Sequence, residues 1–94
     1  MAITVRFIGA FRGVSGKSKI TIKFEEETPL RETIKRIVEK IPELKKVLID
    51  PELEDPRPNT LILVNGKEIS VLNGLQTLLK DGDEVVFIPV IHGG

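Results

Sequence analysis

The sequence predicts a two-layer α+β domain, in which a mixed sheet of four to five strands has one main helix packed on one face. Short segments that alternate apolar and polar residues, or are wholly apolar, occur in both halves of the chain, and one amphipathic segment lies between them. Turn residues separate several of these segments. Two pairs of strands joined through a single amphipathic helix can bury its apolar side only across the sheet, which makes two layers.

Length and composition limit what the protein can be. Its 94 residues, of which 40% are hydrophobic and 30% charged, suffice for one small core and are too few for two domains. No apolar run is long enough to cross a bilayer, and a strand-like pattern begins at Ala2 where a secretory signal would begin. We therefore expect a cytoplasmic protein without a membrane partner. Fourteen basic residues balance fourteen acidic ones, so we expect no direct nucleic-acid binding.

Side chains suited to catalysis are scarce. The absence of cysteine removes disulfides, thiolate metal ligands and a cysteine nucleophile. The only histidine, His92, lies close to the chain end, where a catalytic base is hard to hold rigidly. A hydrolase built on two carboxylates is the remaining enzymatic alternative, although no two of the fourteen acids stand out as a pair. We expect no enzymatic activity, no bound metal and no bound cofactor.

Two strands are predicted near the N-terminus. Apolar and polar residues alternate at 3–7 and at 20–24, which is the period of half-buried strands. Residues 12–16 (Arg-Gly-Val-Ser-Gly) supply the small residues of a hairpin loop, so the two strands should be antiparallel neighbours. The same glycines could be interpreted as a phosphate-binding loop, but they lack its spacing, and a strand instead of a helix follows them.

One helix is predicted at 29–41. Thr28 can cap its start, and proline suits its first position. Its apolar residues recur at spacings of three and four: Leu30, Ile34, Ile37, Val38 and Ile41. The acidic triplet at 25–27 could belong to a partner surface, but negative charge beside the positively polarised start of a helix explains it better.

The second half of the chain combines connecting segments with strands. Four prolines fall between 42 and 58, so we expect an exposed loop at 50–59 after a short helical turn at 44–48. Residues 61–64 are apolar without alternation, which favours a strand covered on both faces. A hairpin turn at Asn65-Gly66 leads into a returning strand at 68–71. A helical or irregular stretch at 75–79 is followed by the turn Asp81-Gly82-Asp83 and a last strand at 85–88.

Together, these residues resemble a known family, the ubiquitin-like sulfur carriers of the β-grasp fold. The resemblance rests on Leu61-Ile62-Leu63-Val64-Asn65-Gly66, Leu78, Asp81-Gly82-Asp83-Glu84-Val85, Phe87-Ile88-Pro89 and the final Gly93-Gly94. The group includes the small subunit of molybdopterin synthase, the thiamine-pathway sulfur carrier and the ubiquitin-related modifier. Phe87-Ile88-Pro89 looks most like the first, whereas Arg57-Pro58 and His92-Gly93-Gly94 look most like the last. We expect a domain at 1–90 and a flexible tail at 91–94.

The resemblance implies that the reactive group is the Gly94 carboxylate. A separate adenylating enzyme would use ATP and magnesium to make an acyl-adenylate, which a sulfur donor would convert to a thiocarboxylate. The sulfur would pass to a pterin precursor, with the large subunit of molybdopterin synthase as partner, or to a tRNA base through a tRNA-thiolating enzyme. Residues Val90, Ile91, His92, Gly93 and Gly94 would enter the partner's active site. Extended, they reach roughly 17 Å, and glycine passes through a narrow channel because it has no Cβ.

Two alternatives stand beside the sulfur carrier. The protein could be a ubiquitin-like modifier joined through Gly94 to lysines of other proteins, or a β-grasp binding module with an inert tail. The first alternative shares the activation step and differs in the acceptor.

A carrier also needs a surface on which its partner docks. The sheet face opposite the helix is the candidate because it lies beside the last strand. The apolar residues expected on this face are Ile8, Phe11, Val86 and Ile88, and Arg6 and Lys67 are expected at its rim.

Overall fold

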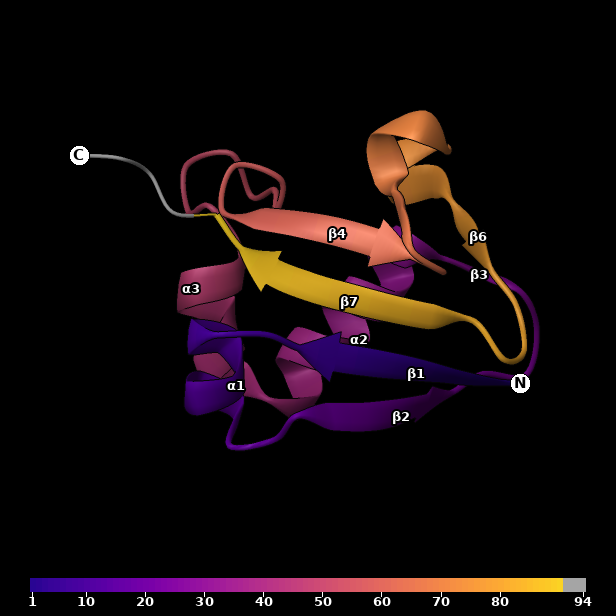
Figure 1. The fold of residues 1–94 in the computed structure, drawn as a ribbon, viewed down its shortest axis with the longest axis horizontal. Coiled ribbons are helices and arrows are strands. Elements are labelled where there is room, and N and C mark those ends of the chain that lie inside the picture. The colour runs from indigo at the N-terminus through magenta and orange to yellow at the C-terminus, as the bar shows by residue number, and fades with distance from the viewer. Residues whose placement is uncertain (91–94) are drawn as a thin grey trace.

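The computed structural model describes residues 1–90, which form a five-stranded sheet packed against one long helix (Figure 1). The sheet has the order β2-β1-β7-β4-β5. Its strands are β1 (Ala2–Phe7), β2 (Lys19–Lys23), β4 (Thr60–Val64), β5 (Lys67–Glu68) and β7 (Glu84–Pro89). Because β7 runs parallel to β1 and antiparallel to β4, the sheet is mixed, and the predicted α+β class is confirmed. The tail predicted at 91–94 lies outside the described residues.

The core lies between the sheet and α2 (Leu30–Lys40), which is behind the sheet in Figure 1. Every second residue of the central strands is buried against this helix, for example Val5 on β1, Phe87 on β7 and Ile62 on β4. Phe7 and Phe87 are register partners, and their rings stack with centroids 6.3 Å apart. This alternation leaves the other side of every strand on the open face of the sheet.

The start of α2 differs from the prediction. Pro29 is the cap residue in an extended conformation, and the Thr28 hydroxyl donates to the carbonyl of Glu26 instead of capping the helix. The reason is that β3 (Thr28–Pro29) pairs with β6 (Leu78–Leu79) in a second, two-stranded sheet. The pairing holds this segment extended until Leu30, whose N–H donates to the carbonyl of Thr77.

The loop predicted at 12–16 is wrong, because Ala10–Ser15 form a helix, α1. The strands on either side of it are antiparallel neighbours, as predicted. Gly9, with φ of 57°, turns the chain out of β1, and Gly16, with φ of 72°, ends the helix. Burial of Phe11, which is 1% exposed, explains why a helix forms where the sequence offers mostly small and polar residues.

Short helices connect α2 to β4. The predicted helical turn exists as η1 (Pro42–Leu44) and α3 (Lys45–Leu48), which bury Leu44 and Leu48.

β4 is covered on one face only, contrary to the prediction, since Leu61 and Leu63 are only half-buried. The strand returning from Asn65-Gly66 is only β5, and the chain then forms η2 (Ile69–Val71) and η3 (Gly74–Gln76) before β6. No helix within residues 1–90 has the length and apolar character to cross a membrane.

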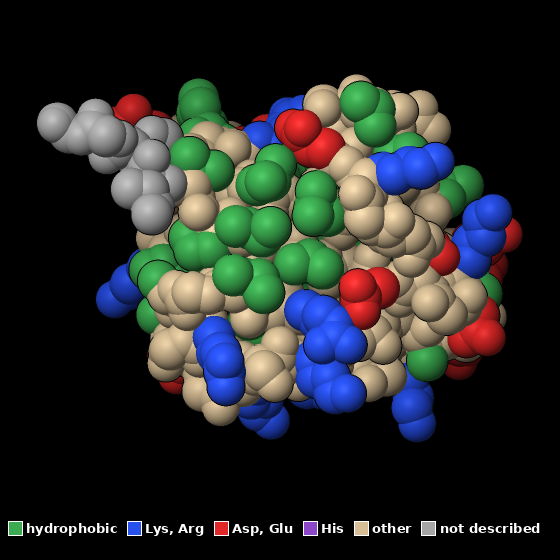
Figure 2. Space-filling model, viewed as in Figure 1, with side chains coloured by type: hydrophobic (Ala, Val, Ile, Leu, Met, Phe, Trp, Pro, Cys, Tyr) green, Lys and Arg blue, Asp and Glu red, His purple; other side chains and the backbone are tan. Residues whose placement is uncertain are grey.

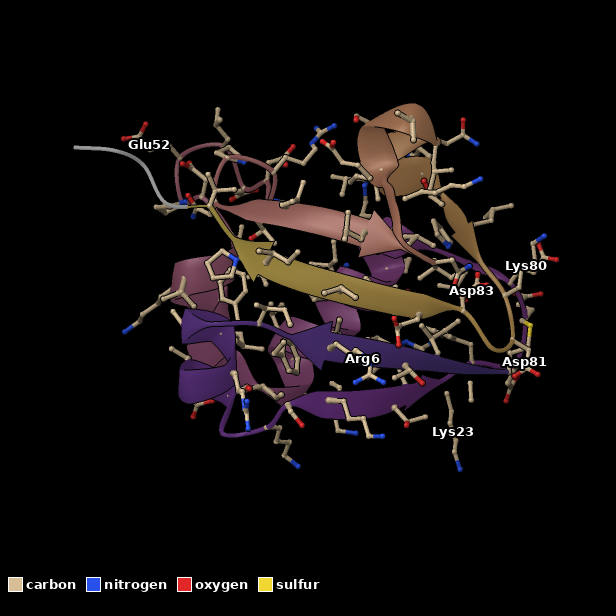
Figure 3. The ribbon with its side chains drawn as sticks, viewed as in Figure 1. Arg6, Lys23, Glu52, Lys80, Asp81 and Asp83 are labelled. Atoms are coloured by element: carbon tan, nitrogen blue, oxygen red, sulfur yellow. The ribbon has the colours of Figure 1, made fainter. Side chains whose placement is uncertain are left out.

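The Asn65-Gly66 and Asp81-Gly82-Asp83 turns hold each other at one end of the sheet. The Asp83 carboxylate accepts hydrogen bonds from the Asn65 side-chain amide at 2.9 Å and from the Lys80 backbone N–H at 2.8 Å. The Asn65 side-chain oxygen accepts from the N–H of Glu84, and the Asp81 carboxylate accepts from the N–H of Ala2. Figure 3 shows Asp81 and Asp83 together at this end. The Asp81-Gly82-Asp83 part of the resemblance therefore has a structural role in its local contacts.

Candidate partner-binding site

The open face of the sheet carries an apolar patch formed by Leu61, Leu63, Val86 and Ile88, which we call the sheet patch. The register places Val86 between Arg6 on β1 and Leu63 on β4, and it places Ile88 opposite Leu61. All four apolar residues are half-buried. Figure 2 shows the resulting continuous apolar area over the middle of the sheet. A contiguous apolar surface of this kind, rimmed by polar residues, is typical of a protein-binding site.

A charged rim borders the sheet patch. The Arg6 guanidinium donates through Nε to the Glu84 carboxylate at 2.6 Å, and the two side chains are 46% and 40% exposed. Arg6 points out over the sheet in Figure 3. An exposed ion pair of this kind contributes little to stability. Arg6 and Glu84 can therefore give up their ion pair and form new ones with charged side chains of a partner.

Some of the residues predicted for this face lie on it in the structure, and two do not. It places Val86, Ile88 and Arg6 on the open face, and Ile8, 44% exposed, just beyond the end of β1. Phe11 is a correction, because it is buried in the helical layer and cannot contact a partner. Lys67 is a second correction. It is the register partner of Val64, which faces the core, whereas Glu68 is the partner of Leu63 and shares the open face.

Sequence reasoning missed Leu61 and Leu63. All four residues of Leu61-Ile62-Leu63-Val64 are apolar, so no alternation marks which two face the core. The missing signal lies in the pairing of β4 with β7 and of β7 with β1. The alternating strand β1 places Arg6 on the open face, Val86 is the register partner of Arg6, and Leu63 is the register partner of Val86. That pairing is not between sequence neighbours and could not be read locally.

The end of β7, at Pro89 and Val90, is fixed by contacts with neighbouring segments on both sides. Beyond β7, the Val90 N–H donates to the carbonyl of Asn59 at 2.9 Å. On the other side, the Ile8 N–H donates to the carbonyl of Phe87, and Gly9 lies so close that a Cβ there would be 3.4 Å from Pro89 Cγ. Residues 91–94, predicted to enter a partner's active site, lie outside the described part. Val90 itself is 40% exposed.

The residues before β4 form the exposed loop that the prolines predict. Residues 51–54 are exposed, whereas Pro56 is buried and anchors the loop. Asp55 accepts hydrogen bonds from both the backbone N–H and the guanidinium of Arg57. The side-chain hydrogen bond from Arg57 is the main reason why the pKa of Asp55 lies below its ordinary value, and partial burial opposes this shift.

The apolar patch on the open face makes the described surface suited to binding another protein. Within residues 1–90, no group of three or more histidine, cysteine, aspartate or glutamate side chains is placed to hold a metal ion. The strand order and the single long helix on one face of the sheet define the class of ubiquitin-like proteins with the β-grasp fold.

The comparisons with known proteins identify the family. The model of the ThiS family matches residues 5–94, and the chain belongs to this family. Small archaeal modifier protein 3 of Haloferax volcanii is 29% identical over 94 residues, which cover 100% of both chains. The solution structure of Urm1 from Trypanosoma brucei is 29% identical with a TM-score of 0.81, covering 99% of this chain and 95% of that one.

A second similar structure is a complex. A chain in the protein–protein complex of subunits 1 and 2 of the molybdopterin-converting factor from Helicobacter pylori is 26% identical, with a TM-score of 0.63 and coverage of 100% of both chains. These relatives confirm the predicted fold and family. The protein is a small ubiquitin-like protein of the sulfur carrier and modifier class.

Proposed function

We propose that the protein carries sulfur on the carboxylate of Gly94. An adenylating enzyme joins this carboxylate to AMP with ATP and magnesium and releases pyrophosphate. Hydrosulfide released by a sulfur donor then attacks the acyl carbon, AMP leaves, and a thiocarboxylate remains. The observation that carries this proposal is the match to the ThiS family, which extends through residue 94.

The separate roles of the folded domain and the chain end support the proposal. A carboxylate is a poor electrophile because it is anionic and lacks a good leaving group, so another protein must activate it. The domain's part is to place the chain end. β7 lies between β1 and β4, and the contacts of Val90 and Pro89 fix the point from which the tail departs. A partner that binds the domain therefore receives the tail at a defined position, which is the basis of efficient intracomplex reactions.

We propose the sheet patch, together with Ile8 and Arg6, as the surface on which the adenylating enzyme and the sulfur-accepting enzyme dock. The likeness to a chain of the molybdopterin-converting factor complex supports a partner subunit of this kind. It favours a pterin precursor as the acceptor, with the large subunit of molybdopterin synthase as partner. A tRNA base, reached through a tRNA-thiolating enzyme, is the alternative acceptor.

Conjugation to lysines of other proteins is the second candidate function. Small archaeal modifier protein 3 matches the chain over the whole length of both, and this favours a modifier role. Both functions begin with the same acyl-adenylate, so one protein can serve both.

Intact mass and proteome analysis test the proposal. Protein purified from its native cells is expected to carry one sulfur in place of one oxygen, and fragmentation should place it on the last residue. The same protein lacking Gly94, expressed in the same cells, is the control and should have only its unmodified mass. Branched Gly-Gly remnants on lysines of other proteins would show conjugation. If the protein is unmodified in every growth condition and no Gly-Gly remnants are found, the proposal is wrong. The remaining interpretation is then a binding module with an inert tail.

A further inference from the structure

Residues 50–59, which we call the acidic loop, lie at the end of the molecule where the described chain leaves β7. The register pairs Thr60, just after the loop, with Pro89, and the Val90 N–H donates to the carbonyl of Asn59 within it. Figure 1 shows the loop above the end of β7, and Figure 3 shows Glu52 on it. A protein that binds the chain at Val90 therefore has the acidic loop within its reach.

The acidic loop has a defined shape although most of it is exposed. The Asp50 side chain accepts hydrogen bonds from the N–H groups of Glu52 and Leu53, each at 2.9 Å. The Asp50 backbone exchanges hydrogen bonds with the loop as well, because its N–H donates to the carbonyl of Asp55 and its carbonyl accepts from Glu54. A surface loop closed by its own contacts in this way is often functional.

This fixed loop presents an apolar side chain between two acids. Leu53 is 68% exposed, and Glu52 and Glu54 flank it. Neither glutamate is in an ion pair within residues 1–90, where the ion pairs are Arg6–Glu84 and Arg57–Asp55. Folding gains nothing from leaving a leucine in water. Binding would gain from burying it, and a preorganised loop loses little conformational entropy when it binds.

We propose that the acidic loop is a recognition element for the adenylating enzyme. Leu53 enters an apolar pocket of that enzyme, and Glu52 and Glu54 face lysine or arginine side chains at the rim of the pocket. Gly93 and Gly94 have no side chains, so an enzyme that selects this carrier among proteins ending in two glycines must contact other residues. The acidic loop is next to Val90, the last described residue before the chain end, and its charge would complement a basic partner. This inference rests on the proposed function.

The test is ATP–pyrophosphate exchange by the adenylating enzyme, with the dissociation constant of the complex measured beside it by calorimetry. Leu53→Ser is expected to raise KM and Kd about tenfold with kcat unchanged, as for the loss of a central apolar contact. The double variant Glu52→Gln, Glu54→Gln is expected to raise both constants about threefold to fivefold at low salt, with the difference fading as salt screens the charges.

Matched variants control for exposure and charge. Val71→Ser removes an apolar side chain that is 72% exposed on η2, at the other end of β4, and should leave KM unchanged. The double variant Glu25→Gln, Glu26→Gln removes the same charge from an exposed site before α2 and should also behave like the wild type. Equal increases in KM for control and loop variants would overturn the inference, because the effect would then be general.

The outcomes separate the two proposals. If the wild type is activated and deletion of Gly94 abolishes exchange, but the loop variants match the wild type, the acidic loop is not a recognition element and the proposed function stands. If the enzyme binds without exchange, activation of Gly94 is wrong, and the Kd values of the loop variants decide the inference. If there is neither binding nor exchange, both proposals fail.

Discussion

Acidic turns lie at both ends of the central strands, but the two ends serve different purposes. At one end, Asn65-Gly66 and Asp81-Gly82-Asp83 form a closed set of hydrogen bonds that joins β4, β7 and the start of β1. At the other end, Asp50 and Asp55 organise the acidic loop in the same manner, but the loop also exposes Leu53. Acidic turns at both ends stabilise the backbone, because a carboxylate satisfies N–H groups that no ladder pairs.

The difference between the ends lies in what each leaves for a partner. At the end formed by the Asn65-Gly66 and Asp81-Gly82-Asp83 turns, which we call the closed end, the aspartates accept hydrogen bonds from backbone N–H groups and from Asn65. The end beside Val90 holds the last described residues of the chain, and it also presents Leu53 and two glutamates that are in no ion pair within residues 1–90. We infer that changes at the first end act on stability and that changes at the second act on binding. The predictions that follow test this division.

Deletion of Gly94 should have the largest effect on function. It should reduce ATP–pyrophosphate exchange by more than about a hundredfold, because the carboxylate is withdrawn by about 3.5 Å and a misplacement of 1 Å can cost about that much. The free energy of unfolding should change by no more than about 0.5 kcal/mol, since no side chain is lost. Exchange assays and thermal melts of the same preparations measure both. Gly94→Ala should be milder, because the carboxylate stays in place. Equal exchange by full-length and truncated protein would show that the terminal glycine has no role in activation.

Val86→Asp should weaken partner binding by about thirtyfold, which corresponds to about 2 kcal/mol, because it introduces a charge at the centre of the sheet patch. Its melting curve should remain cooperative, since Val86 lies on the open face. Thr21→Asp, on the same face of the edge strand β2, is the matched control and should bind like the wild type. Titration calorimetry with the adenylating enzyme measures the difference. Unchanged affinity for Val86→Asp would mean that the partner uses another face.

Asp83→Ala should destabilise the closed end. It removes the acceptors for Asn65 and for the Lys80 N–H, and the free energy of unfolding should fall by about 1–2 kcal/mol. Asp81→Ala removes only the acceptor for the Ala2 N–H and should cost about half as much. Urea unfolding gives both values. Exchange by the folded fraction should equal that of the wild type, and a loss of exchange without a loss of stability would contradict the division between the two ends.

Asp55→Asn should have the smallest effect, a loss of stability that is present at neutral pH and disappears in acid. Because Arg57 holds the pKa of Asp55 below its ordinary value, the native state binds fewer protons than the unfolded state at acidic pH. The resulting stability is present above the unfolded pKa, about 3.9, and is lost as the pH falls through the lower folded pKa. Arg57 is 55% exposed, so solvent screening limits this contribution to under about 1 kcal/mol.

Urea unfolding between about pH 2 and 6 tests this prediction. The stability of Asp55→Asn should change less with pH below about pH 4 than that of the wild type. Parallel curves for the two proteins would show that the hydrogen bond from Arg57 has no counterpart in solution.

The sequence by itself determined the elements whose signals are local. Alternation places the inner residues of β1, and spacings of three and four place the apolar side of α2. The Asp81-Gly82-Asp83 turn was also predicted, because the turn depends on glycine and on carboxylates that bond the nearby backbone. The order and spacing of these signals were enough to identify the fold and the family.

The tertiary structure decided every feature that depends on residues far apart in the chain. Burial of Phe11 made a helix of the segment predicted to be a loop. Pairing of β4 with β7 turned Leu61 and Leu63 toward the open face, although nothing within an all-apolar strand distinguishes its two sides. The hydrogen bond between Val90 and Asn59 brought the acidic loop to the exit of the chain. Hydrogen-bond registers and burial between distant segments form only when the chain is packed, so short stretches of sequence do not encode them one by one.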